Sequence, residues 1–453
     1  MDETIKAKIG LILALSISGL LALQFVVRGS GSPPMTDPEP AQTRAFAFFF
    51  PLVTRPICYT CYYVDSVHGS DANAGTSADA PWRTLAPVQA LDLAPGSIVY
   101  LRRGSTWTGG LYLDDSGLPD RPIRITAYGE GPPPVITHPG NASNWTRGVS
   151  IRADWIIVED ILIRDVHEAG VYLYPEADHN IIRHLEIHDA GTGVTVGGQY
   201  NLVTHNYIHD LHMVRSTPDP HDDFGAVGVN LYNSYNEVSF NRMENCLAPS
   251  LDYGIDGGGV EIYGYMESNR IHHNWVAHSA GFLEVGGGAA RDITVSYNVS
   301  VDNGRFSYLH LTGHYASLVE NFRIEHNTIV EVAGAENGWA LLAFGGSPTP
   351  DTLLARNNIL YADRYNYIAN EGGFSHDHNL YYLGGGTALG FELGQGEIVG
   401  DPLFVNRAAA DFHLLPGSPA IDAARDLGYP RDFENHLVPT GPAPDLGAFE
   451  YDG

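Results

Sequence analysis

Apolar and polar residues alternate in short segments that recur along the chain from about residue 148. Examples are GVSIR (148–152), GVYLY (170–174), GVNLY (228–232) and GVEIY (259–263). A period of two predicts β-strands with one apolar face, and recurrence of one unit predicts a stack of coils in which each unit covers the next. The inward positions are Val149, Val171, Val194, Val229, Val260, Leu283, Leu309 and Leu341, joined by Ile151, Leu173, Val196, Leu231, Ile262, Val285, Leu311 and Ala343.

The residues between these inward positions should face outward on one parallel sheet. They are Ser150, Tyr172, Thr195, Asn230, Glu261, Glu284, His310 and Leu342. A second row recurs between the alternating segments, in motifs such as VTHNYIHD and IEHNTIVE, and it is mostly asparagine. Its members are Ile161, Leu185, Asn206, Asn241, Asn274, Asn298, Asn327, Asn357 and Asn379. Asparagines at one turn of successive coils can hydrogen-bond along the stack, because neighbouring strands lie about 4.8 Å apart.

These repeats resemble the right-handed parallel β-helix superfamily of pectate-lyase-like, carbohydrate-active proteins. The segment YYVDSVHGSDANAGTSADAPWRTLAPVQAL (62–91), followed by APGSIVYLRRG, resembles the superfamily's first strand, N-terminal capping helix and first coil. DPLFVNRAAADFHLLPGSPAIDAA with DLGAFEY resembles its closing segment. The resemblance implies an all-β, single-stranded right-handed parallel β-helix of about ten coils with an N-terminal capping helix. It leaves the reaction open, because the fold carries lyases, hydrolases, epimerases and adhesins.

We divide the chain into five parts on this basis. Residues 1–30 are a signal or membrane-anchor segment and 31–57 a linker. Residues 58–140 form the N-terminal cap and first coils, 141–385 the β-helix with its active-site loops, and 386–453 the C-terminal coils and cap. Lys6 and Lys8 precede an uncharged apolar run, residues 9–27, that is nearly long enough to cross a bilayer. We therefore expect an extracellular or cell-surface protein, secreted or anchored by residues 9–27, and membrane contact through this segment alone.

Two inserted loops point to the functional face. The steps from Thr195 to Asn230 and from Asn230 to Glu261 are longer than most, because MVRSTPDPHDDFGA (213–226) and LAPSLDYGIDGGG (247–259) are inserted there. Long loops beside one stretch of a regular solenoid are usually functional. The loops bring Asp256 and further acidic residues toward Glu261 and Glu284.

Glu261 and Glu284 occupy the same outward position in consecutive coils. Stacking predicts that their carboxyl groups lie about 5 Å apart, the separation typical of retaining glycosidases. Two carboxyls this close favour one protonated and one ionised form, which is an acid and nucleophile pair in an order that the sequence leaves open. Asp256 is the rival for either catalytic role, and a wider pair of Asp256 with Glu284 predicts inversion instead.

Further residues of this face are candidates for binding substrate. Asn230 lies beside Glu261, His310 can orient Glu284, and aromatic rings can stack on sugars. The substrate-binding candidates are Asn230, His310, Tyr232, Tyr263, His221, Asp222, Asp223, Asp252 and Trp339. We expect no required cofactor and no metal centre, with Ca²⁺ bound by Asp219, Asp222 and Asp223 as the alternative. Cys58 and Cys61 are either a local disulfide or two free thiols.

Composition narrows the choice of reaction. The 453-residue chain carries a formal net charge of −28, which argues against nucleic acid and against polyuronates as partners. Lys6 and Lys8 are its only lysines, so a lysine base is excluded from the folded part. We predict a monomeric glycoside hydrolase that cleaves a largely neutral polysaccharide or oligosaccharide with two carboxylates. The alternatives are a polysaccharide lyase, a uronate C5-epimerase, because Asp-Pro-His-Asp at 219–222 resembles a motif of alginate epimerases, and a non-catalytic carbohydrate-binding or adhesin solenoid.

Overall fold

The computed structural model describes residues 58–332 and 339–453, which belong to one compact unit spanning 51–453. The apolar run at 9–27 and the linker at 31–57 lie outside the described residues. Within these residues, no helix has the length and apolarity needed to cross a bilayer.

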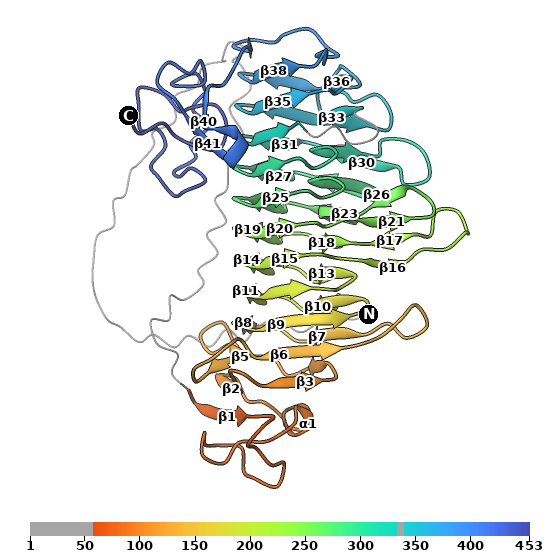
Figure 1. The fold of residues 1–453 in the computed structure, drawn as a ribbon, viewed down its shortest axis with the longest axis vertical. Helices are drawn as coiled ribbons and strands as arrows, with labels where there is room; N and C mark the ends of the chain where they lie inside the picture. The colour runs from red at the N-terminus through yellow and green to blue at the C-terminus, as the bar shows by residue number, and fades with distance from the viewer. Residues whose placement is uncertain (1–57, 333–338) are drawn as a thin grey trace, which may run out of the picture. The chain divides into compact units, whose positions relative to one another are not determined.

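The described chain winds into three long parallel sheets that run side by side along the stack (Figure 1). Sheet A contains β1 (Thr60–Val64), β2 (Ser97–Arg102), β5 (Ile123–Tyr128), β8 (Ile156–Glu159), β11 (Ile181–Arg183), β14 (Leu202–Thr204), β19 (Glu237–Ser239), β24 (Arg270–His272), β27 (Thr294–Ser296), β31 (Phe322–Glu325), β34 (Leu353–Arg356) and β37 (Ser375–Asp377). Sheet B contains β3 (Thr106–Thr108), β6 (Val135–His138), β9 (Leu162–Val166), β12 (Glu186–His188), β15 (Tyr207–His209), β20 (Arg242–Glu244), β25 (Trp275–Ala277), β28 (Val299–Val301), β32 (Thr328–Glu331), β35 (Ile359–Asp363), β38 (Leu380–Gly384) and β39 (Ile398–Val399).

Sheet C carries the outward row of the sequence analysis. It contains β4 (Leu111–Leu113), β7 (Arg147–Ile151), β10 (Ala169–Leu173), β13 (Thr192–Val196), β18 (Val227–Leu231), β23 (Gly258–Glu267), β26 (Leu283–Arg291), β29 (Ser307–Leu309), β33 (Ala340–Phe344) and β36 (Tyr367–Ala369), with β30 (Ser317–Glu320) pairing the second half of β26. Sheets A and B have 12 strands each, so the stack has about twelve coils rather than the predicted ten.

The predicted capping helix is not formed. The single α-helix of the described residues is one turn, α1 (Ala86–Gln89), beside the first coils. The sequence around it is rich in proline, and the side chain of its N-cap residue, Leu85, makes no capping hydrogen bond, so it supports no longer helix. The parallel β-helix itself is confirmed, and a continuous apolar core fills its interior.

Asparagine ladders hold the coils together at a turn. Asn206, Asn241, Asn274, Asn298 and Asn327 are linked by side-chain bonds from each amide to the next, for example Asn274 Nδ2 to Asn298 Oδ1 at 3.0 Å. The ladder continues through Asn358 and Asn379, so the predicted member Asn357 was wrong by one residue. A second ladder, which the sequence analysis missed, joins Asn180, Asn201, Asn236 and Asn269.

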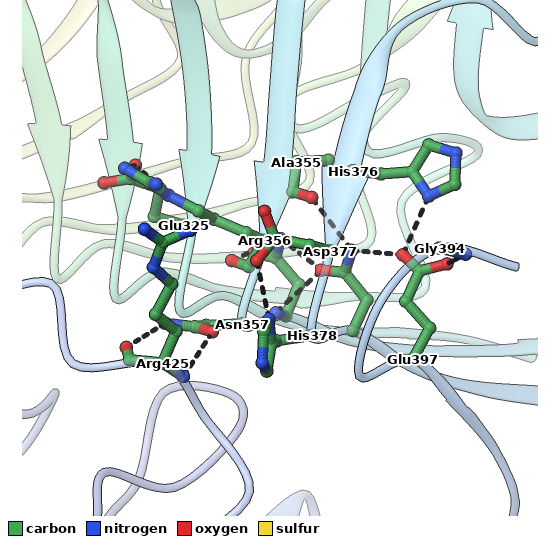
Figure 2. A network of polar contacts seen from close by, with 12 residues as sticks. Glu325, Ala355, Arg356, Asn357, His376, Asp377, His378, Gly394, Glu397 and Arg425 are labelled. Carbon is green, nitrogen blue, oxygen red and sulfur yellow. Dashed lines mark hydrogen bonds and ion pairs between the residues drawn. The ribbon is translucent and has the colours of Figure 1, made fainter. Parts of the chain in front are cut away.

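Figure 2 shows how the first ladder ends and what Asn357 does instead. Asn379 Nδ2 donates to Glu397 Oε1 at 2.9 Å, and His376 reaches the same oxygen at 3.0 Å. Asn357 adopts a left-handed backbone (φ 58°) and exchanges two hydrogen bonds with the backbone of Arg425. The ladder thus ends at the carboxylate of Glu397. Asn357, next to the ladder member Asn358, instead attaches the C-terminal segment through Arg425.

The C-terminal segment folds back along the side of sheet B (Figure 1). It contains β40 (Phe404–Asn406), the 3-10 turn η1 (Arg407–Ala409) and β41 (Asp411–Leu414). Phe412 and Phe449 pack in one apolar cluster with residues of several coils, from Trp275 to Tyr361. Gly447 N–H also donates to the Asn357 carbonyl at 2.8 Å. The C-terminal segment therefore packs against the coils that contain β25 to β35.

Candidate functional site

The first six positions of the outward row, counted along the chain, are in register, as the sequence predicts. Ser150, Tyr172, Thr195, Asn230, Glu261 and Glu284 pair successively across β7, β10, β13, β18, β23 and β26. The last two predicted positions of the row, His310 and Leu342, are wrong. Glu284 pairs with Tyr308, so His310 lies two residues further along the chain. Leu342 is buried in the core, because the chain between β29 and β33 shifts the alternation by one residue.

Both inserted segments form antiparallel hairpins rather than irregular loops. β16 (Met213–Arg215) pairs with β17 (Phe224–Gly225), and β21 (Ala248–Ser250) pairs with β22 (Gly254–Asp256). They project from the edge where β18 and β23 begin (Figure 1). The Asp-Pro-His-Asp motif at 219–222 lies in the first hairpin turn, and not on a coil of the sheet.

Glu284 is held in place by two hydrogen bonds to one oxygen. Tyr263 OH donates to Oε1 at 2.9 Å, and His310 Nε2 lies 2.9 Å from the same atom. The side chain of Glu284 is only 21% exposed. Burial alone would raise its pKa, but the bond from His310 and the positive charge of Arg305 outweigh burial and hold the pKa below its ordinary value. Glu284 is therefore the ionised member of the pair, and neither bond uses Oε2.

Glu261 has the opposite electrostatic environment. Burial, together with the negative charges of Glu284 and Asp256, raises the pKa of Glu261 well above its ordinary value. Burial also raises the pKa of Asp256 to about 6, with a further contribution from Glu284 and against a hydrogen bond from Gly257 N–H. The site thus contains an ionised carboxylate at Glu284, a carboxyl group at Glu261 that holds its proton well above the usual pH range, and Asp256, which loses its proton near pH 6.

A tyrosine that the sequence analysis missed bridges the two edges of this face. Tyr315 follows β29, and its carbonyl accepts a hydrogen bond from Gly287 at 2.8 Å, beside Glu284 on β26. Its hydroxyl donates to the carbonyl of His221 at 2.9 Å and lies 3.0 Å from the hydroxyl of Tyr253. Its ring contacts Tyr263 edge-on at 5.8 Å. No repeat pattern marks a loop residue of this kind, so only the folded chain reveals it.

Most of the remaining candidates lie around the carboxylates, and Trp339 lies apart from them. Asn230 is buried beside Glu261, and Tyr232 and Tyr263 follow on the outward side of the same strands. The backbone of His221 contacts Tyr315, and its ring stacks on His314 at 4.7 Å. Trp339 is exposed at the start of β33, two coils beyond Glu284. The structure therefore gathers most of the candidates around the carboxylates but leaves Trp339 at the periphery.

Three aspartates of the hairpins lie together. Ligand oxygens of Asp222, Asp223 and Asp252 are within 4.8 Å of one another, whereas Asp219 lies outside this group. Asp223 is buried and accepts hydrogen bonds from Ser250 Oγ (2.7 Å), Leu251 N–H (2.7 Å) and Thr217 N–H (2.6 Å). Asp222 pairs with Arg215. The protein's own donors fill these oxygens, so Asp223 acts as a cross-link between the two hairpins.

Replacing the cross-link should loosen both hairpins. In Asp223→Ala, we expect backbone amides of residues 248–253 to exchange about 10-fold faster in hydrogen–deuterium exchange, because their acceptor is lost. Asp219→Ala, an exposed change in the same turn, is the control. Hydrogen bonds lower the pKa of Asp223 to about 2 despite burial, so the cross-link should persist above about pH 4 and weaken as the pH falls toward 2. Unchanged exchange in Asp223→Ala would contradict the assignment.

Cys58 and Cys61 form a disulfide at the start of β1, and Cys246 is buried as a free thiol. This agrees with the first of the two alternatives for the Cys-Tyr-Thr-Cys motif. Several histidines of the repeats are turn residues, whereas His188, His209 and His272 end strands β12, β15 and β24. His184, His205, His273, His326 and His378 all have left-handed backbones, a conformation in which histidine is enriched.

Comparison with known proteins agrees with this architecture. A family model described as "Right handed beta helix region" matches residues 147–359. In the solved structures, pectate lyase Pel9A superposes with a TM-score of 0.60 at 16% identity, covering 87% of this chain and 97% of that one. A rhamnogalacturonan lyase superposes with a TM-score of 0.51 at 14% identity, covering 78% and 92%. The chain is therefore a right-handed parallel β-helix with the pectate-lyase-like fold.

One curated protein is similar in sequence over a short stretch. It is a lacto-N-biosidase of Bifidobacterium longum subsp. longum, 47% identical over 94 residues. The match covers 19% of this chain and 6% of that protein. The chain thus spans only a small part of the length of this relative.

Proposed function

We propose that the protein is a glycoside hydrolase in which Glu284 is the ionised carboxylate and Glu261 the acid. The observation that carries the proposal is the in-register pairing of two glutamates whose environments shift their pKa values in opposite directions. Such a pair is how glycosidases obtain an acid and a nucleophile from one residue type. The stretch similar to a lacto-N-biosidase supports the same reaction class.

The geometry favours retention of configuration. Side chains paired on adjacent parallel strands lie about 5 Å apart, the separation of retaining enzymes. Glu261 would protonate the leaving oxygen while Glu284 Oε2 attacks the anomeric carbon and forms a glycosyl-enzyme ester. Glu261, now ionised, would take a proton from water, and the resulting attack on the anomeric carbon would release the sugar and restore both carboxyl groups.

Product analysis on a glycan panel tests the reaction class. We expect products that have gained one water per cleaved bond from a neutral glycan such as a xylan, glucan, galactan or β-linked lacto-N-bioside. An unsaturated, ultraviolet-absorbing end would indicate a lyase instead. Unchanged mass with altered uronate configuration would indicate an epimerase, and binding without turnover would indicate an adhesin. Each of these three results would overturn the proposal.

The pH dependence of kcat/KM should be bell-shaped and should respond to Asp256. The acidic limb should lie below the ordinary pKa of a glutamate, where Glu284 gains a proton, and activity should fall at higher pH as Glu261 loses its proton. Because the charge of Asp256 helps to raise the pKa of Glu261, Asp256→Asn should move the alkaline limb to lower pH while activity remains. If Asp256→Asn abolishes activity across the profile, Asp256 is the acid and inversion by Asp256 and Glu284 is the better mechanism.

The sequence also supports a proposal for where the enzyme acts and on which substrates. We propose that the enzyme is exported and that residues 9–27 are removed or retained as an anchor, outside the described residues. It acts as a monomer without a required cofactor. With a net charge of −28, its substrate is a neutral glycan rather than a nucleic acid or polyuronate.

A further inference from the structure

Three consecutive glycines, residues 286–288, lie on β26 where its register with β23 shifts. Tyr263 pairs with Gly286, but Tyr265 pairs with Ala289. β26 therefore has one residue more than β23 between these two pairs, which is a β-bulge. A Cβ atom on the third glycine would lie 2.1 Å from a backbone oxygen of β23, so only glycine fits at the bulge. The bulge explains the third glycine and leaves the first two to be explained.

The first two glycines lie under the ring of Tyr263. A Cβ atom on Gly286 would lie 2.9 Å from Cε1 and Cζ of Tyr263, and one on Gly287 would lie 3.0 Å from Cδ1. A side chain at either position would therefore take the space that the ring occupies. Because Tyr263 belongs to β23 and both glycines belong to β26, the ring crosses from its own strand onto the next one. We call Gly286 and Gly287 the glycine seat.

The crossing brings the phenol to the carboxylate of Glu284. Gly286 is two residues beyond Glu284 on the same face of β26, so a ring that lies over Gly286 points to that carboxylate. Tyr263 OH donates to Glu284 Oε1 at 2.9 Å. Tyr315 holds the other side of the ring, because it contacts Tyr263 edge-on at 5.8 Å while its carbonyl accepts from Gly287 N–H at 2.8 Å. The ring is thus fixed by the glycine seat and by Tyr315.

The electrostatic environment keeps the phenol a donor. Burial, with the negative charges of Glu284 and Glu261, raises the pKa of Tyr263 far above its ordinary value, so the hydroxyl retains its proton. Against the effect of burial, the pKa of Glu284 is lowered by His310 and Arg305 and further by the hydrogen bond from Tyr263. Both hydrogen bonds reach Oε1, which leaves Oε2 as the oxygen that can attack.

We propose that Tyr263 is the positioning residue for Glu284 and that the glycine seat holds its ring in place for this role. This inference rests on the proposed hydrolase function, in which Glu284 Oε2 attacks the anomeric carbon. Fixing Oε1 gives Oε2 one orientation before the substrate arrives, which lowers the cost of reaching the attacking geometry. In the glycosyl-enzyme ester, Oε1 is the carbonyl oxygen and can keep the same hydrogen bond. The strand that carries the acid, Glu261, therefore also positions the nucleophile.

Tyr263→Phe tests this role, because it keeps the ring and removes only the hydroxyl. We expect kcat to fall about 10- to 100-fold, as for loss of one hydrogen bond to a charged group, with KM changed less than about 2-fold. The acidic limb of the pH profile should move up by about one pH unit, since one contact that lowers the pKa of Glu284 is lost. Tyr265→Phe, 81% exposed on the same strand, is the matched control and should leave kcat and the limb unchanged.

Gly286→Ala tests the glycine seat separately. Gly286 does not have a left-handed backbone, so alanine adds only a methyl group against the ring. We expect the same fall in kcat and the same movement of the acidic limb as in Tyr263→Phe. The double variant should be little worse than either single variant, because both changes break one hydrogen bond. Losses that multiply in the double variant would overturn the role of the seat.

A measurement without turnover separates this inference from the hydrolase itself. Full-length protein with carboxyl-¹³C-labelled glutamate is titrated by NMR, and the Glu284 signal is assigned by its disappearance in Glu284→Gln. The carboxyl pKa should rise in Tyr263→Phe and Gly286→Ala and stay constant in Tyr265→Phe. Glu261, Arg305 and His310 also face this carboxylate, and all three are retained in every one of these variants.

The outcomes are distinct. A raised carboxyl pKa in both variants, with no hydrolysis of any glycan by the wild type, would support the positioning of Glu284 and overturn the hydrolase. Hydrolysis by the wild type, with an unchanged carboxyl pKa and an unchanged acidic limb in Tyr263→Phe, would overturn the positioning role and leave the hydrolase. A lower kcat in Tyr263→Phe without movement of the limb would show a merely structural role and would also overturn the proposal.

Discussion

Glu284→Gln should lower kcat by about three to four orders of magnitude while the protein folds normally. The change removes the ionised oxygen that the reaction requires but keeps the size of the side chain and an acceptor for Tyr263 and His310. The measurement is steady-state hydrolysis of the glycan identified by product analysis, with circular dichroism to verify the fold. Since the substrate still meets the same surface, KM should change much less than kcat.

Two variants sharpen this expectation. Glu267→Gln alters an exposed glutamate on β23, the strand of Glu261, and should keep nearly full activity. In Glu284→Gly, added azide should restore turnover of an activated aryl glycoside and give a glycosyl azide, because the small anion replaces the missing nucleophile. Near wild-type kcat in Glu284→Gln would rule out the assigned role, and hydrolysis without azide rescue would shift the assignment toward an inverting base.

Asn298→Ala should destabilise the fold by about 3 kcal/mol, the largest stability effect that we expect from one polar side chain. Asn298 is fully buried. Its Oδ1 accepts from the backbone N–H and the side chain of Asn274, and its Nδ2 donates to the Ile271 carbonyl at 2.9 Å. Alanine would leave these buried groups without partners and without access to water, which costs far more than an exposed hydrogen bond.

Urea denaturation followed by circular dichroism measures this effect as a lower transition midpoint. Asn141→Ala is the control, since Asn141 is exposed in a loop and its side chain accepts only a local bond from Ser143. An unchanged midpoint in Asn298→Ala would show that the ladder contributes specificity of register rather than stability.

The sequence predicted the features that repeat. Strand alternation identified the inward row from Val149 to Val285 correctly, because burial on one face imposes a strict period of two. The same reasoning brought Glu261 and Glu284 together, since equal positions in adjacent coils must be neighbours. The repeat pattern therefore predicted both the architecture and the pairing of Glu261 with Glu284.

The predictions failed where the repeat is interrupted. The motif ARNNILYA contains two adjacent asparagines, and only the left-handed backbone of Asn357 shows that Asn358 is the ladder member. Between Glu284 and Leu342 the chain includes β30, so counting residues gave the wrong face for Leu342. Tyr315 and the cross-link at Asp223 depend on contacts between distant loops, which no local pattern encodes.

The backward fold of the C-terminal segment changes how this stack can come apart. In a simple solenoid each coil touches only its neighbours, so the end coils fray one at a time. Here Phe412 and Phe449 span coils from Trp275 to Tyr361, and Asn357 and Arg425 fasten the segment to its turn. Unfolding from the C-terminal end must first detach the C-terminal segment, and the coils that it contacts should then unfold together. The protein should therefore resist gradual unravelling, such as stepwise trimming by exopeptidases, and lose its upper half in one cooperative event.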